Sequence, residues 1–266
     1  MKEITYHGFP VSLALLADLH NTDPALVISS LRSHAPSLIA ITGDVLYGSA
    51  PVDDVSPLEK QENVLPFFQA CSSIAPTFLS LGNHEWMLDR TDLAAISATG
   101  VTVLDNSWIT TVVDGKNIVL AGLSSGYVTD YRAFRETTDG SVRYPKKEGL
   151  SGISGVRTEH KPDTGWLEQF ATQPGMKICL SHHPEYYPHI PSSIDLILSG
   201  HAHGEQWRMY NPFKREWTGT WSPGQGWWPR YTKGVYDGRM VVSAGLSNTT
   251  WVPRIGNPTE VVYLEH

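Results

Sequence analysis

The chain has 266 residues, of which 41% are hydrophobic and 18% are charged, so it holds enough apolar material to bury a substantial core in one domain over residues 1–266. Its 20 Lys and Arg against 27 Asp and Glu give a formal net charge of −7, the wrong sign for a surface that collects polyanions, so duplex nucleic acid is not expected as a partner. No run reaches the roughly 18 apolar residues of a membrane span.

Five short apolar runs without helical period predict strands that are buried on both faces. They cover residues 11–17, 38–42, 77–81, 177–181 and 194–199. Helices are predicted between the early runs, over residues 24–33 after Asp23, over residues 58–73 and over residues 89–99. A strand followed by a helix, repeated along the chain, indicates an α/β layered fold.

The pattern changes after Gly100, where strands are predicted over residues 101–104, 108–113 and 117–120. The dipeptide Asp114-Gly115 between the last two is a strong hairpin signal. The final strands are predicted over residues 239–244 and 260–264. The second half therefore adds mixed or antiparallel pairing.

Two long stretches, residues 124–161 and 204–238, lack clear periodicity and are expected to be loops that carry function. The second stretch is rich in aromatic residues between positions 207 and 236, which suit stacking on a substrate or peripheral contact with a lipid surface. We favour a hydrophobic cluster packed over the edge of the sheet. The aromatic residues are Trp207, Tyr210, Trp217, Trp221, Trp227, Trp228, Tyr231 and Tyr236.

The two cysteines, Cys71 and Cys179, lie far apart, and each stands in an apolar stretch. This arrangement predicts buried free thiols rather than a disulfide, and it fits a reducing compartment such as the cytoplasm.

Polar clusters follow each of the five buried strands. Because ligands of open α/β sheets bind beyond the carboxyl ends of the strands, these clusters are expected to meet in one place. They are Asp18-Leu19-His20, Gly43-Asp44, Gly82-Asn83-His84-Glu85, Ser181-His182-His183-Pro184 and Gly200-His201-Ala202-His203-Gly204.

Each cluster alone has a structural explanation: a solvated turn, a residue that ends a strand, a helix cap or a surface histidine pair. Their joint occurrence favours a metal site. Carboxylate, imidazole and amide donors without cysteine suit Mn²⁺, Fe²⁺ or Zn²⁺. The donors exceed what one tetrahedral ion needs, so two divalent ions that share a carboxylate are expected.

The order of these motifs resembles the calcineurin-like metallophosphoesterase superfamily. Residues 204–208, 233–236 and 242–245 resemble its bacterial branch, which is similar to membrane-associated phosphoesterases and sugar-nucleotide lipid pyrophosphatases. The resemblance implies a four-layer αββα sandwich in which helices flank two central mixed β-sheets.

The resemblance also assigns the site residues. One ion would be held by Asp18, His20 and His203, the other by Asn83, His182 and His201, with Asp44 as the bridge. His182 is preferred to His183 because the family ligand stands two residues before the proline, here Pro184. His84 matches the general acid, and Glu85 is expected to orient a neighbour.

The resulting expectation is a dinuclear metal-dependent phosphodiesterase or pyrophosphatase that acts on a small phosphorylated or nucleotide-type substrate through a metal-bridging hydroxide. The alternatives are a metal-bound scaffold that binds a phosphorylated ligand or a protein without catalysis, and a nuclease. The retained Asp44 and His84 disfavour the scaffold, and the acidic charge disfavours the nuclease. A metallopeptidase is disfavoured because the H-E-x-x-H motif is absent.

Overall fold

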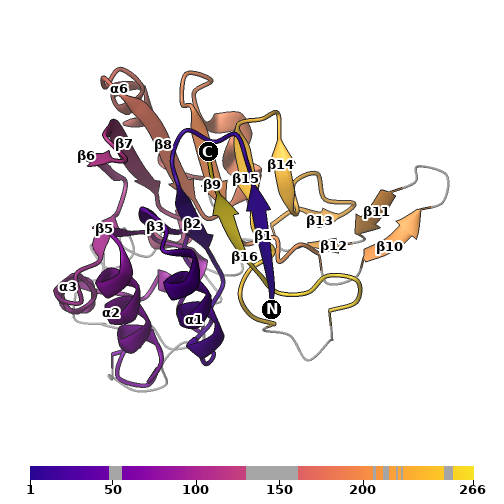
Figure 1. Cartoon of the computed structure of the whole chain (residues 1–266), viewed down its shortest axis with the longest axis horizontal. Helices are drawn as coiled ribbons and strands as arrows, with labels where there is room; N and C mark the ends of the chain where they lie inside the picture. The colour runs from indigo at the N-terminus through magenta and orange to yellow at the C-terminus, as the bar shows by residue number, and fades with distance from the viewer. Residues whose placement is uncertain are drawn as a thin grey trace.

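Two six-stranded mixed sheets form the centre of the protein (Figure 1). The computed structural model describes residues 1–47, 56–129, 161–205, 208–211, 216–219, 221–222, 224–248 and 254–266. The first sheet contains, in spatial order, β1 (Lys2–Tyr6), β16 (Glu260–Leu264), β2 (Leu13–Leu16), β3 (Leu38–Ile41), β4 (Thr77–Ser80) and β5 (Thr102–Leu104). The second contains β14 (Gly234–Tyr236), β15 (Met240–Val242), β9 (Leu196–Ser199), β8 (Met176–Ser181), β7 (Lys116–Leu123) and β6 (Ser107–Val113).

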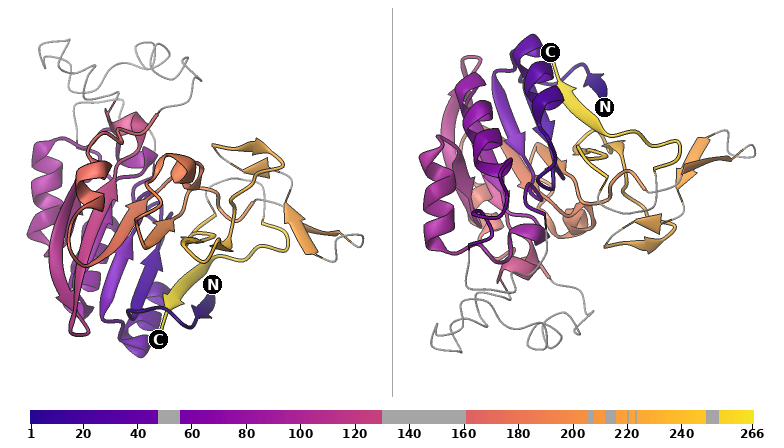
Figure 2. Two further views of the ribbon diagram at one scale, coloured as in Figure 1. Left: turned by 90° about the horizontal axis from the view of Figure 1, so that it is seen from above. Right: turned by 90° about the horizontal axis from the view of Figure 1, so that it is seen from below.

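The helices and the smaller strands lie around these sheets. They are α1 (Ala25–His34), α2 (Val64–Ile74), α3 (Arg90–Ala98), α6 (Leu167–Ala171), the 3₁₀ helices η1 (Asn83–Glu85) and η2 (Pro184–His189), and the hairpins β10 (Arg208–Asn211) with β11 (Glu216–Gly219) and β12 (Trp221–Ser222) with β13 (Gly226–Trp227). Figure 1 shows α1, α2 and α3 together along one side, with β10 to β13 on the other side of the molecule. Both views of Figure 2 show the β10–β11 hairpin standing away from the sheets.

Successive side chains of the central strands enter different layers of the core, because the side chains of a strand alternate between its two faces. In β2, Ala14 and Leu16 pack in the cluster that includes α1 and α2. Leu13 and Leu15 face the second sheet instead. Strands of this kind need apolar residues at every position, which explains the continuous apolar runs of the sequence.

The second sheet shows the same alternation and completes the four layers. In β8, Ile178 and Leu180 pack between the two sheets. Cys179 faces outward against Leu167 and Phe170 of α6 and its neighbours. The predicted sandwich of two mixed sheets flanked by helices is confirmed.

The first and last residues of several elements differ from the sequence prediction. The five buried strands are present within one or two residues of their predicted bounds, but β1 was not predicted. Helix α2 begins at Val64 rather than at residue 58, because residues 57–60 form a turn. Most of residues 124–161 lie outside the described part of the chain. The stretch 204–238 is not a plain loop, since it contains β10 to β14.

The hairpin between β6 and β7 forms as the sequence predicts. Asp114 has a φ of 50° and Gly115 a φ of 73°, the two left-handed residues that a tight hairpin turn requires. The predicted thiols are also confirmed, since Cys71 and Cys179 are both free and buried. Among the described residues, no helix combines the length and apolar character that crossing a bilayer requires.

The aromatic residues of the stretch 204–238 divide into two groups. Tyr231 is buried and packs in the outer cluster of the second sheet beside Tyr236, as a packed cluster predicts. That expectation is wrong for Trp227 and Trp228, which are 73% and 75% exposed. Trp207 lies outside the described residues.

Candidate metal centre

The loops that follow β2, β3, β4, β8 and β9 meet at the carboxyl ends of both sheets and bring the predicted side chains together. Among the described residues, four groups of possible ligand atoms each lie within 4.8 Å of one another. One is His183 with Glu185 and His201, and the other three contain only predicted site residues. They are Asp18 with His20 and His203, His20 with Asp44 and His84, and Asp44 with His182 and His201.

Asp44 is the shared member of this arrangement. Its Oδ2 lies 3.0 Å from His182 Nε2 and 3.7 Å from His84 Nε2. The same oxygen is 4.0 Å from His20 Nε2. Its Oδ1 accepts a hydrogen bond of 2.8 Å from the backbone N–H of His84. Asp44 therefore faces histidines that come from both sheets.

Asp18 occupies a similar position on the neighbouring loop. Its Oδ1 lies 3.6 Å from His203 Nε2 and 3.9 Å from the Nε2 atoms of both His20 and His182. Its Oδ2 accepts a hydrogen bond from the backbone N–H of His201. One carboxylate oxygen is thus fixed by the backbone, and the other points to the histidines.

Several of these converging atoms are buried without a hydrogen-bond partner in the described part of the chain. They are Asp18 Oδ1, His20 Nε2, Asn83 Oδ1 and His182 Nε2. A buried polar atom without a partner costs about 1–3 kcal/mol, so four such atoms in one place require an explanation. Oxygen and neutral imidazole nitrogen are donors for divalent cations, so these residues fit a metal ion.

The Nδ1 atoms of His20 and His182 are each hydrogen-bonded to a backbone carbonyl. His20 Nδ1 donates to Leu46 O at 3.1 Å, and His182 Nδ1 donates to Thr42 O at 2.7 Å. In the neutral ring of His20, Nδ1 carries the proton and Nε2 keeps a lone pair on the side of Asp44. His182 takes the same tautomer once a cation displaces its Nε2 proton, because Asp44 and Asp18 raise its pKa to about 10. This is the tautomer that binds a metal.

His203 differs, because its Nδ1 accepts a hydrogen bond instead of donating one. Arg254 donates from Nη2 to His203 Nδ1 at 2.9 Å, and a guanidinium cannot accept. The proton of the neutral ring therefore lies on Nε2, and a cation bound at that atom would have to displace it.

Burial and neighbouring charges set the protonation of the site. Burial lowers the pKa of His20 to about 3 and lowers the pKa values of His201 and His203 well below 6.5, so these rings are neutral at pH 7. Burial also opposes charge on His182, but Asp44 and Asp18 more than offset it and raise its pKa to about 10. The centre therefore favours positive charge between its carboxylates.

The backbone is in the left-handed region at five of the seven predicted ligands. Their φ values are 57° at Asp18, 49° at His20, 54° at Asp44, 62° at His201 and 50° at His203. Non-glycine residues rarely adopt this conformation, and such residues concentrate at functional sites.

Close backbone approaches explain two of the glycines around the site. Gly43 has a φ of 97°, and a Cβ there would lie 2.6 Å from the Cα of Gly82. A Cβ on Gly245 would lie 2.8 Å from Asp18 Oδ2. A side chain at Gly43 would push the loop of Asp44 away from that of Asn83, and one at Gly245 would displace the Asp18 carboxylate.

Glu85 ties the loops after β3 and β4 together. Its buried carboxylate accepts from the backbone N–H groups of Asp44 and Gly82 at 2.8 Å through Oε2. Its Oε1 accepts from Val45 at 2.8 Å and from Leu46 at 3.2 Å. Glu85 thus orients its neighbours, as expected from the sequence.

His84 and the pair His182 and His183 occupy distinct environments. The His84 side chain is 27% exposed, whereas that of His182 is fully buried. His183 faces away from Asp44, with Nε2 at 2.8 Å from Ser125 Oγ and Nδ1 at 3.0 Å from Glu185 Oε1. The sequence did not single out Glu185, although it follows the His-His-Pro motif, or Arg254, which has no motif around it.

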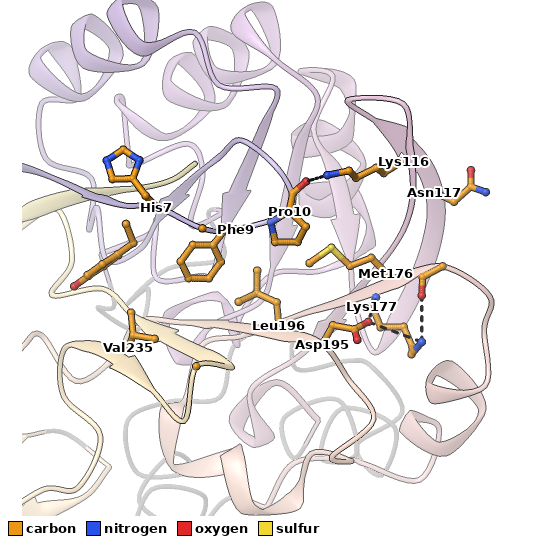
Figure 3. Close-up of a pocket in the computed structure, with 14 residues that line it drawn as sticks. His7, Phe9, Pro10, Lys116, Asn117, Met176, Lys177, Asp195, Leu196 and Val235 are labelled. Carbon is orange, nitrogen blue, oxygen red and sulfur yellow. Dashed lines mark hydrogen bonds and ion pairs between the residues drawn. The ribbon is translucent and has the colours of Figure 1, made fainter. Parts of the chain in front are cut away.

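A cavity of about 960 Å³ lies elsewhere, at the opposite ends of the strands (Figure 3). Lys116, Met176 and Leu196, at the starts of β7, β8 and β9, line it. None of the predicted site residues line this cavity. Its volume therefore does not mark the candidate metal centre.

Residues 11–205 match the sequence model of the calcineurin-like phosphoesterase family. YpbG of Bacillus subtilis (strain 168) is 26% identical over 217 residues, which cover 79% of this chain and 68% of that protein. F40B5.2 of Caenorhabditis elegans, which is named as a metallophosphoesterase, is 27% identical over 80% of this chain and 40% of its own length. A 5′-nucleotidase precursor from Thermus thermophilus has a TM-score of 0.45 at 14% identity, over 82% of this chain and 50% of that chain. This chain thus spans half or less of the length of the last two proteins.

Proposed function

Since the chain belongs to the calcineurin-like phosphoesterase family, we propose that it is a phosphodiesterase or pyrophosphatase that works with two divalent ions, Mn²⁺, Fe²⁺ or Zn²⁺. The observation that carries the proposal is the convergence of buried carboxylate, amide and imidazole atoms that find no hydrogen-bond partner among the described residues. We assign Asp18, His20 and His203 to one ion, Asn83, His182 and His201 to the other, and Asp44 to both.

The chemistry of this site follows from its charge. When bound, two divalent ions would supply positive charge that polarises a phosphoryl group and activates a water molecule. Asp18 and Asp44 offset only part of that charge, so the loaded centre attracts a phosphate although the whole chain carries a net charge of −7. The neutral rings of His20 and His201 add no charge of their own.

His84 is the proposed general acid. It is the partly exposed histidine beside Asp44, and its backbone N–H is fixed by the Asp44 carboxylate. Its ring packs edge-on against His20 with ring centroids 4.5 Å apart. A protonated His84 would donate to the departing alkoxide oxygen, a role that contributes about 10²–10⁴ in rate.

The exposed Trp227 and Trp228 support a further element of the proposal, contact with a lipid surface. Tryptophan has an apolar body and a polar N–H, which suits the boundary between lipid and water. Such contact would be peripheral.

The experiment that tests the function combines metal analysis with a substrate panel. The metal-free protein is supplied with Mn²⁺, Fe²⁺, Zn²⁺ or Mg²⁺ and assayed on bis(nitrophenyl) phosphate, nitrophenyl phosphate and a nucleotide pyrophosphate. We expect two ions per chain and hydrolysis of the diester or the pyrophosphate. The Asp44→Asn variant should bind less metal and hydrolyse the substrate more slowly. Hydrolysis of the monoester alone would overturn the substrate class, and two bound ions without any hydrolysis would favour a scaffold.

A further inference from the structure

A chain of polar side chains leads from the interior to one edge of the candidate metal centre. Ser125 Oγ lies 2.8 Å from His183 Nε2, and His183 Nδ1 lies 3.0 Å from Glu185 Oε1. The same Glu185 oxygen lies 3.8 Å from His201 Nε2. The proposed function uses His201 but leaves the other three residues without a role.

The hydrogen bonds of this chain have one direction. An ionised carboxylate only accepts, so His183 Nδ1 donates to Glu185. In the neutral ring, His183 Nε2 is then an acceptor, and it receives the hydroxyl proton of Ser125. Both ring nitrogens of His183 are engaged, so this histidine holds the Glu185 carboxylate in place.

The order of serine, imidazole and carboxylate also occurs in nucleophilic hydrolases. That role does not fit here, because Ser125 is 0% exposed and no substrate reaches its Oγ. The Ser125 hydroxyl lies behind His183, which is itself buried. This row of polar side chains therefore begins with Ser125 in the protein interior and ends with His201 at the metal centre.

The Glu185 carboxylate lies on the Nε2 side of the His201 ring, at a distance of 3.8 Å that is longer than a hydrogen bond. Its negative charge favours the neutral ring that has its proton on Nε2 and a lone pair on Nδ1. His201 belongs to the cluster with Asp44 and His182, where such a lone pair is needed. Carboxylates that orient metal-binding histidines in this way typically contribute 10–100-fold to metal affinity.

Gly224 lies directly against the side chains of Glu185 and His201. A Cβ on Gly224 would overlap Glu185 Oε1 and would lie 3.0 Å from His201 Nε2. The backbone of the segment between β12 and β13 therefore rests on both side chains. A side chain at position 224 would therefore displace the Glu185 carboxylate.

We propose that Glu185 is a positioning residue that sets the tautomer and ring orientation of His201, and that His183 and Ser125 hold Glu185 in turn. The inference rests on the proposed function in one respect, namely that His201 binds a cation.

The test is made on the full chain with Glu185→Gln, and with Glu168→Gln on the exposed face of α6 as the matched control. Competition with a chelator measures Mn²⁺ affinity, and ¹H–¹⁵N correlation spectra of the zinc-loaded protein report the tautomer of His201. We expect Glu185→Gln to lower the affinity for one of the two ions about 10–100-fold and to remove the single Nε2–H tautomer. The control should change neither quantity.

Two milder variants keep the test decisive if Glu185→Gln does not fold. Ser125→Ala removes only the far end of the chain and should lower Mn²⁺ affinity less than Glu185→Gln does. Gly224→Ala displaces the carboxylate without removing its charge and should reproduce the loss of affinity. A wild-type protein that binds two ions and hydrolyses diesters, with unchanged affinity and His201 tautomer in all three variants, overturns the role of Glu185 and leaves the proposed function intact. A wild-type protein that binds no ions overturns the proposed function instead.

Discussion

Replacement of Glu85 by glutamine tests how the loops after β3 and β4 are held at the centre. The carboxylate accepts four backbone N–H groups, those of Asp44 and Gly82 on Oε2 and those of Val45 and Leu46 on Oε1. Glutamine has the same shape, but one of its two terminal atoms is an NH₂ donor. One pair of backbone N–H groups would then face a donor instead of an acceptor.

The expected loss follows from those contacts. Hydrogen bonds to a charged group contribute about 1.5–3 kcal/mol each, and Glu85→Gln removes two of them. A neutral amide is easier to bury than a carboxylate, and it does not repel Asp44, so part of the loss is offset. We expect the free energy of unfolding to fall by about 3 kcal/mol.

Urea unfolding of the metal-free protein measures this change, with the exposed Glu62→Gln as the control. Because Asp44 and Asn83 belong to the two loops that Glu85 joins, metal affinity should fall as well. A loss below about 1 kcal/mol with both ions still bound would refute the reasoning. It would mean that the loops keep their positions without the carboxylate.

Three further outcomes are expected. His84→Ala should retain both ions and lose about 10²–10⁴ in kcat on an alkyl phosphodiester, with a smaller loss on a nitrophenyl diester whose leaving group needs no proton; full turnover on the alkyl ester contradicts the assignment. Burial raises the pKa of Cys179 to about 12 and raises that of Cys71 further, so iodoacetamide at pH 8 should alkylate neither thiol in the folded protein and both in urea, as read by mass spectrometry. Changing Trp227 and Trp228 together to serine should reduce co-sedimentation with phospholipid vesicles, and equal sedimentation of the two proteins argues against lipid contact.

The fold could be predicted where burial of a strand requires a recognisable run of apolar residues in the sequence. Strands β2, β3, β4, β8 and β9 are covered on both faces, so each needs a continuous apolar run. Edge strand β1 has no such requirement, since three of its five residues are exposed, and it joins the sheet through backbone pairing with β16. Leu58 is buried although it lies in a turn, so an apolar residue there extended the predicted helix beyond its true start.

The candidate site could be located for a related reason, because a strand that ends at a sheet edge places its next polar residue there. What the sequence does not show is the conformation of those residues. A left-handed backbone costs a non-glycine residue about 1–2 kcal/mol, and Asp18, Asp44 and His201 all adopt it. Each follows a strand that is fixed in the core by its neighbours, so the strain is borne by packing that lies several residues away. The contacts of Glu185 with His201 and of Arg254 with His203 join segments that lie far apart in the sequence, so no local pattern predicts them.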